Sequence, residues 1–377
     1  MRLPESLGTG RSTLGVTVVG LGATGCALAA FLSLRGYHVT LYGRNPSRVD
    51  TILTQGGIRI TGDLGELVVP LLLVTSDLDF AMRERLILVS IRQNGQRALA
   101  KAMGPRIRED HTVLLLSGGA GCLETVHVWR THGIGIQCCL GETSAPAHSS
   151  RLLEDGTVVV RVSPRRRTLR VAAFPAHENG RLLENIDGFF SVRPGKHVLE
   201  VALCNANVVL HPLPMLLNLG AIERRRGQFA LMAEGMTSGV LRVVDAHDEE
   251  RMRLLTAVGA DPVPVDALFE ELGLDPQEYR ESRPAPKFFD QIEERFLTED
   301  IPCGTAFMAS LGRLLGISTP VSDAILQLAS CLRGESFVTT GRTCKRLGIA
   351  GLNKDQLSNY LLHGSAPSLE PAASGRA

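Results

Sequence analysis

A glycine-rich turn near the N-terminus places the strongest constraint on how this chain can fold. The apolar run 15–19 (Gly-Val-Thr-Val-Val) leads directly into Gly-Leu-Gly-Ala-Thr-Gly, and a helix-like stretch, 26–35, follows. In a strand–turn–helix unit of this kind, Gly20 permits the sharp turn and Gly22 lets a pyrophosphate approach the backbone. Gly25 lets the helix and the strand pack closely, and the helix N-terminus offers free N–H groups.

This order of elements predicts the phosphate-binding corner of a dinucleotide-binding fold. The predicted cofactor-binding residues of the turn are Gly20, Gly22, Ala23, Thr24 and Gly25. The alternative is a glycine-rich strand-to-helix turn in an unrelated α/β protein.

The end of the second predicted strand, 38–42, indicates which dinucleotide is bound. Folds that use NAD usually carry Asp or Glu here, which accepts hydrogen bonds from the ribose hydroxyls. This chain has Gly43 and Arg44 instead, and the next carboxylate is Asp50. Because Arg44 can pair with a 2′-phosphate, we predict a preference for NADP(H), with NAD(H) as the second candidate. Alternatively, Arg44 is simply solvated and the backbone holds the ribose.

The pattern of apolar residues divides the chain into two parts. Strand-like runs alternate with helical stretches up to about residue 195, which predicts an α/β, parallel, doubly wound sheet of Rossmann type. Two short strands are expected within 57–74. Beyond the boundary the apolar spacing becomes helical, which predicts an all-helical C-terminal domain. The predicted parts are a flexible tail 1–14, a dinucleotide-binding domain 15–195, a helical substrate domain 196–364 and a disordered tail 365–377.

Proline and glycine separate the helical stretches of the second part. The stretches predicted there, after the first one that starts near His197, are 226–246, 248–257, 285–296, 303–315 and 320–333.

Composition argues against several classes of function. The net charge of +1 gives no indication of nucleic acid or an anionic membrane as partner. The eight cysteines form no CxxC pair and no Cys/His spacing suited to zinc, so no metal site is expected. The polar residues 1–14 do not resemble a signal peptide, and no apolar stretch reads as a bilayer span. We therefore expect a cytoplasmic protein.

Two runs in the second part carry candidate chemistry. In Asn-Val-Val-Leu-His-Pro, Asn207 and His211 are four residues apart and share one helix face, and Pro212 marks a helix end or kink. The run 295–302 (Arg-Phe-Leu-Thr-Glu-Asp-Ile-Pro) brings an arginine and two carboxylates beside a proline. Taken singly, a lone histidine of this kind is often structural, and the second run can be a capped loop.

Together these runs resemble the opine dehydrogenase family of octopine/nopaline type, over nearly the whole chain. The resemblance rests on the glycine turn, Glu142-Thr143 with Pro146 and Arg151, the Asn-x-Asn-x-x-x-His-Pro run, the Arg-Phe-Leu-Thr-Glu-Asp-Ile-Pro run, and the segments 316–320 and 341–348. It implies a Rossmann domain joined to a helical domain. It also implies that the enzyme condenses an amino acid with a 2-oxo acid and reduces the imine with NAD(P)H.

The resemblance also assigns roles to individual residues. It implies that His211 and Asp300 form the catalytic His–Asp pair and that Asn207 lies beside the substrate. It places Arg295 near the carboxylate of the 2-oxo acid, and Glu142 in the substrate-binding region. The chemistry agrees, because imine formation needs a group that exchanges protons near neutral pH, and a planar carboxylate suits an arginine.

One segment departs from the family pattern, and two other functions stay open. Family members often have an aromatic residue after the proline and a cysteine before the arginine, whereas this chain has Ala-His-Ser-Ser at 147–150. The amine substrate can therefore be unusual. The alternatives are a 2-oxo acid reductase of the ketopantoate reductase kind and a non-catalytic NADP-binding regulator. Small-molecule substrates are the expected partners, and a homodimer is one expected assembly.

Overall fold

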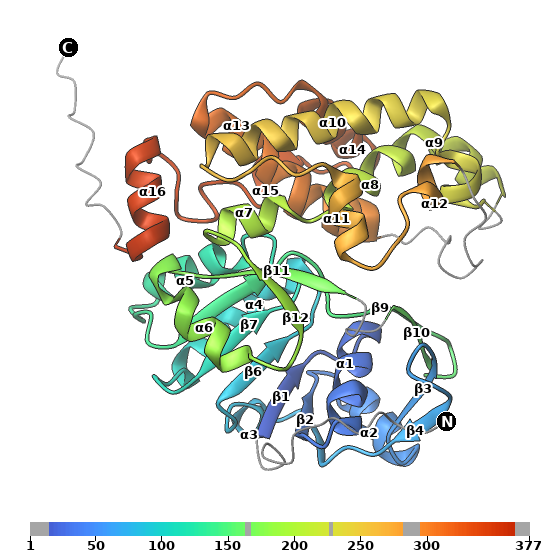
Figure 1. The fold of residues 1–377 in the computed structure, drawn as a ribbon, viewed down its shortest axis with the longest axis vertical. Helices are drawn as coiled ribbons and strands as arrows, with labels where there is room; N and C mark the ends of the chain where they lie inside the picture. Colours follow the sequence, from blue (N-terminus) through green and yellow to red (C-terminus); the bar gives the residue numbers. More distant parts are fainter. Residues whose placement is uncertain (1–14, 163–166, 226–228, 282–294, 366–377) are drawn as a thin grey trace.

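The computed structural model describes residues 15–162, 167–225, 229–281 and 295–365. The predicted tails, 1–14 and all of 365–377 except Ser365, lie outside the described residues. Figure 1 shows two stacked parts, with the strands in one and most of the helices after residue 195 in the other.

The first part is built on a sheet that has eight strands within the described residues, in the order β12-β11-β8-β7-β6-β1-β2-β5. Neighbouring strands are parallel except β8 and β11, which pair antiparallel. The strands are β1 (Gly15–Val19), β2 (His38–Tyr42), β5 (Leu73–Thr75), β6 (Leu86–Val89), β7 (Thr112–Leu115), β8 (Cys139–Thr143), β11 (Thr168–Ala173) and β12 (Ser191–Pro194). Helices cover both faces, so the central strands are apolar and fully buried. The predicted α/β fold with a helical C-terminal domain is confirmed.

Helices connect the strands of this sheet. They are α1 (Ala23–Leu34), α2 (Pro46–Thr54), α3 (Leu78–Ala81), α4 (Gln93–Met103), α5 (Gly121–Thr131) and α6 (Asn179–Ile186). Helix α1 is rich in alanine, and Ala27, Leu28, Ala29 and Ala30 expose no surface. Alanine favours the helix and allows close packing on both sides.

A second, smaller sheet covers the outer side of α1. Within the described residues its order is β4 (Leu67–Val69), β3 (Ile58–Gly62), β10 (Val158–Val162) and β9 (Ser149–Leu152). Phe31 of α1, Ile60 of β3 and Val160 of β10 belong to one buried apolar cluster. The segment 57–74 thus contains the two predicted strands, β3 and β4, and also the start of a third, β5. Strands β3 and β4 belong to the second sheet, whereas β5 belongs to the main sheet.

The second part is helical. Its α-helices are α7 (Val198–Leu203), α8 (Asn207–Leu210), α9 (Pro212–Arg225), α10 (Ser238–Ala257), α11 (Val265–Glu271), α12 (Gln277–Arg280), α13 (Ala306–Leu315), α14 (Pro320–Arg333), α15 (Phe337–Thr340) and α16 (Lys354–His363). Two π-helices, Leu231–Gly235 and Phe296–Thr305, interrupt the series. The last strand of the first part ends at Pro194, and α7 begins at Val198.

Several predicted helices differ from the structure. Helix α10 runs without a break through the predicted gap near residue 247, because no proline or glycine stands there and Asp248 pairs with Arg251 one turn later. The predicted helix 303–315 begins only at Ala306, because residues 303–305 belong to the π-helix, which accommodates Pro302 inside its span. The predicted helix 320–333 matches α14. Most of the predicted helix 285–296 lies outside the described residues.

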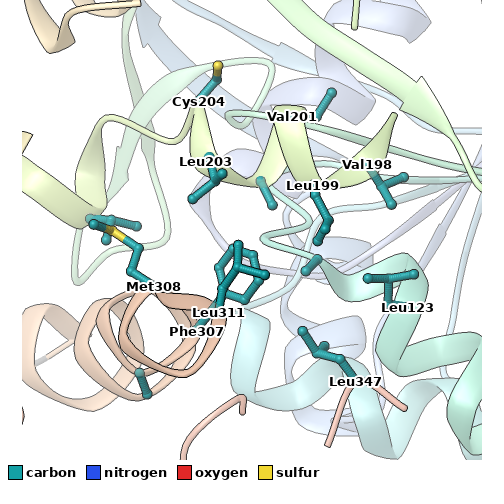
Figure 2. Close-up of a cluster of buried hydrophobic side chains, with 14 of the residues drawn as sticks. Leu123, Val198, Leu199, Val201, Leu203, Cys204, Phe307, Met308, Leu311 and Leu347 are labelled. Carbon is teal, nitrogen blue, oxygen red and sulfur yellow. The ribbon is translucent and has the colours of Figure 1, made fainter. Parts of the chain in front are cut away.

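The helical segment Val198–Arg225 is long enough to span a membrane and contains an apolar window of 18 residues, but 89% of that window is buried inside the protein. Such burial is typical of a core helix, and Figure 2 shows Val198, Leu199, Val201 and Leu203 packed among other apolar side chains.

The two parts share one apolar core. Leu123 of α5 lies in the same buried cluster as Leu199, Leu311 and Leu347, which come from the second part (Figure 2). Helix α16 also returns to the first part, where the rings of Tyr360 and Phe174 lie 5.0 Å apart. The interface is therefore a continuous packed surface.

Candidate active site

The glycine turn has the geometry that its sequence predicts. Gly20 has φ +129°, and a Cβ there would lie 2.2 Å from the carbonyl oxygen of Ser90. A Cβ at Gly25 would lie 2.0 Å from the carbonyl oxygen of Gly20, so strand and helix could not pack as they do. A Cβ at Gly22, in contrast, would meet no atom within 4 Å apart from its immediate chain neighbours, which leaves room for a phosphate group. The turn fits a dinucleotide.

Thr24 and Ala23 open helix α1 directly after this space, at the helix N-terminus that favours phosphate. The Thr24 hydroxyl lies 2.9 Å from the hydroxyl of Ser90, at the end of β6. The turn is thereby fixed to the neighbouring strand end.

The end of β2 carries a glycine at position 43, where any larger residue would displace the side chain of Leu21. A Cβ at Gly43 would lie 2.2 Å from Cγ of Leu21. The next residue, Arg44, is exposed. Burial raises the pKa of Tyr42, and the positive charges of Arg106 and Arg44 oppose this rise, so two guanidinium groups lie near the end of β2.

His211 and Asp300 lie in contact, although 89 residues separate them in the chain. His211 Nδ1 lies 2.7 Å from Asp300 Oδ2, and the two side chains are 12% and 4% exposed. Helix α8 ends at Leu210 and α9 begins at Pro212, so the proline break leaves His211 at the junction. Asp300 is carried by the π-helix Phe296–Thr305.

Phe296 supports the histidine ring. The two rings are stacked, with centroids 3.9 Å apart and planes inclined by 22°. Stacking on one side and a carboxylate at Nδ1 fix the orientation of the ring, which leaves Nε2 as its remaining polar atom.

Arg295 and Glu299 lie beside this pair. The guanidinium carbon of Arg295 is 5.3 Å from the centroid of Phe296. Glu299 is buried, and its Oε1 accepts a hydrogen bond of 2.8 Å from the backbone N–H of Gln93. Burial and the neighbouring Asp300 raise the pKa of Glu299, and the charge of Arg295 partly opposes this. The structure thus assigns the histidine contact to Asp300 and an interdomain contact to Glu299.

Asn207 lies at the start of α8, one turn before His211. Its backbone oxygen accepts the N–H of His211 at 3.0 Å, and its side chain is partly exposed. It shares the helical turn with His211 as the sequence predicts.

Glu142, which is predicted to lie in the substrate-binding region, is held by backbone groups in this structure. Its side chain is fully buried, and its two oxygens accept hydrogen bonds of 2.8 Å from the backbone N–H groups of Ala120 and Cys122. Burial raises the pKa of this carboxyl group. Glu142 binds the first turn of α5 in this structure, because free N–H groups at a helix N-terminus attract a carboxylate.

Three neighbours of the site carry no role in the sequence analysis. Phe296 stacks on the His211 ring, and the buried Arg342 donates to the carbonyl oxygen of Gln93. Both residues lie within runs that resemble the family, but no pattern in those runs indicates a ring stack or a contact between the two parts. Gln93 acts through its backbone, for which sequence offers no signal.

The cofactor turn and the histidine pair meet at one edge of the main sheet. Ser90, which touches the glycine turn, is three residues before Gln93, which binds Glu299. Ligands of open α/β sheets bind at this carboxyl edge. Among the residues described, no group of three or more His, Cys, Asp or Glu side chains is arranged to hold a metal ion.

Comparison with known proteins identifies relatives of both parts. Residues 194–333 match the family model "NAD/NADP octopine/nopaline dehydrogenase, alpha-helical domain", and residues 16–165 match "Ketopantoate reductase PanE/ApbA". The chain is 31% identical over 349 residues to the opine dehydrogenase of Arthrobacter sp. (strain 1C), which covers 89% of this chain and 95% of the relative.

Two solved structures share the fold. Octopine dehydrogenase with NADH and L-arginine has a TM-score of 0.67 and 16% identity, over 94% of this chain and 98% of that one. Yersinopine dehydrogenase with NADP+ has a TM-score of 0.66 and 15% identity, over 93% of this chain and 98% of that one. Because the alignment with the Arthrobacter enzyme extends over nearly the full length of both proteins, this chain belongs to the opine dehydrogenase family, whose NAD(P)-dependent members reductively condense an amino acid with a 2-oxo acid.

Proposed function

We propose that this opine dehydrogenase prefers NADPH and uses His211 as its acid and base, with Asp300 holding the ring and Arg295 binding the 2-oxo acid. The contact of 2.7 Å between His211 and Asp300, beside the edge that carries the glycine turn, is the observation that carries the proposal.

His211 moves protons through Nε2, because Nδ1 is held by Asp300. In its neutral form it takes a proton from the ammonium group of the amino acid, which frees the lone pair that attacks the carbonyl carbon. The resulting imidazolium, stabilised by the Asp300 carboxylate, returns a proton to the hydroxyl that leaves as water when the imine forms. When bound, the reduced dinucleotide supplies the hydride that reduces this imine.

Asn207 and Arg295 bind and orient the two substrates. Arg295 offers a planar, charged fork to the carboxylate of the 2-oxo acid, and its place beside Phe296 puts it near the histidine ring. Asn207 presents a neutral amide one turn from His211, suited to hydrogen bonding with the amino acid.

An assay of NADPH consumption tests the reaction itself. Amino acids and 2-oxo acids are supplied in pairs and singly, and mass spectrometry detects the N-(carboxyalkyl)amino acid. Consumption should require both substrates. Oxidation with the 2-oxo acid alone would indicate the ketopantoate reductase kind of activity, which the match of residues 16–165 makes the second candidate. NADPH binding without any oxidation would indicate a regulator.

Arg44 should determine the preference for NADPH. A charge-assisted hydrogen bond to the 2′-phosphate contributes about 1.5–3 kcal/mol, or roughly ten- to a hundredfold in affinity. Arg44→Ala should remove most of this preference, measured as kcat/KM for NADPH against NADH, and leave NADH use nearly unchanged. Arg59→Ala, an exposed arginine of β3, is the matched control. A wild-type enzyme that prefers NADH would contradict the assignment.

Arg295→Lys should raise the KM for the 2-oxo acid by about tenfold and leave the KM for the amino acid little changed. Lysine keeps the charge but loses the planar fork, which costs about 1.4 kcal/mol when one of two hydrogen bonds is lost. Initial rates with each substrate varied in turn measure both constants. Equal effects on both would mean that Arg295 acts through Glu299 as a structural partner.

We also propose a cytoplasmic location and a homodimer. All eight cysteines are free thiols and seven of them are buried, which is typical of a reducing compartment. Light scattering on the purified protein tests the dimer.

A further inference from the structure

Arg342 is a fully buried arginine on the loop between α15 and α16. Its backbone N–H donates a hydrogen bond of 2.7 Å to the carbonyl oxygen of Pro302, inside the π-helix that carries Asp300. The preceding residue must be glycine, because a Cβ at Gly341 would lie 2.9 Å from that same carbonyl oxygen and 2.5 Å from the carbonyl oxygen of Phe337. The loop is therefore fixed to the π-helix.

The side chain of Arg342 reaches into the dinucleotide-binding part. Its Nη1 donates to the carbonyl oxygens of Gly118 and Gly119 at 2.9 and 2.8 Å. Its Nη2 donates to the carbonyl oxygen of Gln93 at 2.8 Å and to Oε1 of Gln96 at 3.0 Å. One guanidinium group thus binds both the first turn of α4, which follows β6, and the loop that follows β7, at the edge of the sheet where the glycine turn lies.

Glu124 of α5 supplies the opposite charge. Its Oε2 lies 2.9 Å from Arg342 Nη2, and its side chain is 1% exposed. Arg346, four residues further along the same loop, pairs with the other oxygen of Glu124 but is 26% exposed. The buried charge of Arg342 is therefore compensated, as a buried ion pair requires.

The loop that Arg342 holds is conformationally demanding. Ser117 and Ala120 have φ of +64° and +67°, a region that residues other than glycine seldom adopt. Such backbone persists only where the surroundings determine it. Here the carbonyl oxygens between these two residues are the ones that Arg342 binds.

The second part binds both backbone polar groups of Gln93. Its carbonyl oxygen accepts from Arg342, and its N–H donates to Glu299, the neighbour of Asp300. We propose that Arg342 is a positioning residue that sets the distance between the dinucleotide-binding edge and the His211–Asp300 pair. This inference rests on the proposed roles of that pair.

The experiment replaces Arg342 with lysine in the full-length enzyme. Lysine keeps a charge for Glu124 but cannot bond the three carbonyl groups and Gln96 together. Displacement of the reacting groups by about 1 Å costs about 10²-fold in rate. We expect kcat to fall by about this factor, and the KM of each substrate and the Kd of NADPH to stay within about twofold of the wild type. The isotope effect with 4-deuterated NADPH should rise, because hydride transfer becomes rate-limiting.

Arg346→Lys is the matched control, since it alters the same carboxylate from the same loop and should leave kcat and the isotope effect unchanged. If Arg342→Lys does not fold, Gln96→Ala removes one acceptor of Arg342 and should lower kcat severalfold with the same rise in isotope effect. A lower Tm with unchanged kcat and isotope effect, in whichever variant folds, overturns the proposal. An equal fall in kcat for Arg346→Lys overturns it too. Failure of the proposed acid and base role appears separately, as normal turnover in His211→Ala.

Discussion

His211→Ala should lower kcat by about 10²–10⁴, the usual contribution of a general acid and base. That range corresponds to about 3–5.5 kcal/mol of transition-state stabilisation. The loss is expected because the replacement removes the group that takes the proton from the amino acid and returns one to the departing water. The kcat is measured from NADPH consumption at saturating substrates.

Two controls separate this role from a structural one. The Kd of NADPH, measured by fluorescence, should change little, because the glycine turn and Arg44 lie in the other part of the chain. Imidazole added to the variant should restore part of the rate, since Phe296 offers a ring surface on which the lost side chain was stacked. A variant with near wild-type turnover would remove the basis of the mechanism and favour the regulator hypothesis.

The sequence predicts the cofactor turn well because its function depends on backbone shape. Gly20 and Gly25 are required by contacts of 2.2 and 2.0 Å that any Cβ would make, so the pattern of residues carries the geometry directly. Gly43 is a further case. Because it has no side chain, Leu21 can pack against it, and the carboxylate typical of NAD-binding folds is absent at this position.

The His211–Asp300 contact could be predicted only through the family resemblance. Local spacing places Asn207 and His211 one turn apart, but it contains no information on a partner 89 residues away. Local sequence likewise does not choose between the adjacent Glu299 and Asp300, and only the resemblance assigns Asp300 to the pair. The π-helix decides it, because successive residues on it point in different directions: Asp300 towards His211 and Glu299 towards Gln93.

Glu142 and Arg342 show what sequence reasoning lacks. A carboxylate in a family motif can bind substrate or a helix N-terminus, and only the distances to Ala120 and Cys122 distinguish the two. Arg342 acts through backbone carbonyl groups, which leave no trace in the pattern of side chains. The same holds for β3 and β4, whose alternation predicts strands but not the sheet that they join.

Asp300→Asn should lower kcat by about ten- to a hundredfold, less than the loss of His211 itself. The amide keeps the size of the side chain but not the negative charge that holds the ring and stabilises the imidazolium. The matched control is Glu299→Gln, which alters the adjacent carboxylate that binds Gln93 and does not contact His211. Its kcat should fall much less. Equal losses in the two variants would contradict the assignment of Asp300.

Glu299→Gln should also make the stability of the folded protein depend less on pH. Burial raises the pKa of Glu299 above its ordinary value of 4.5, so the folded protein holds the proton more tightly than the unfolded chain. The stability from this group is present at low pH and is lost as the pH rises through the raised pKa. Glutamine stays neutral and still accepts from Gln93. When the pH rises from acidic to neutral, the Tm of the variant should therefore fall less than the Tm of the wild type.

The double variant decides whether Asp300 acts through His211. In this case Asp300 orients the imidazole ring of His211 and stabilises its positively charged form. Asp300→Asn should then have little further effect on kcat in an enzyme that already carries His211→Ala. If Asp300 also contacted substrate, the two losses would multiply. The expected result follows from the structure, in which Asp300 is 4% exposed and its Oδ2 lies 2.7 Å from His211 Nδ1. A buried carboxylate in that position reaches the reacting atoms through the histidine ring.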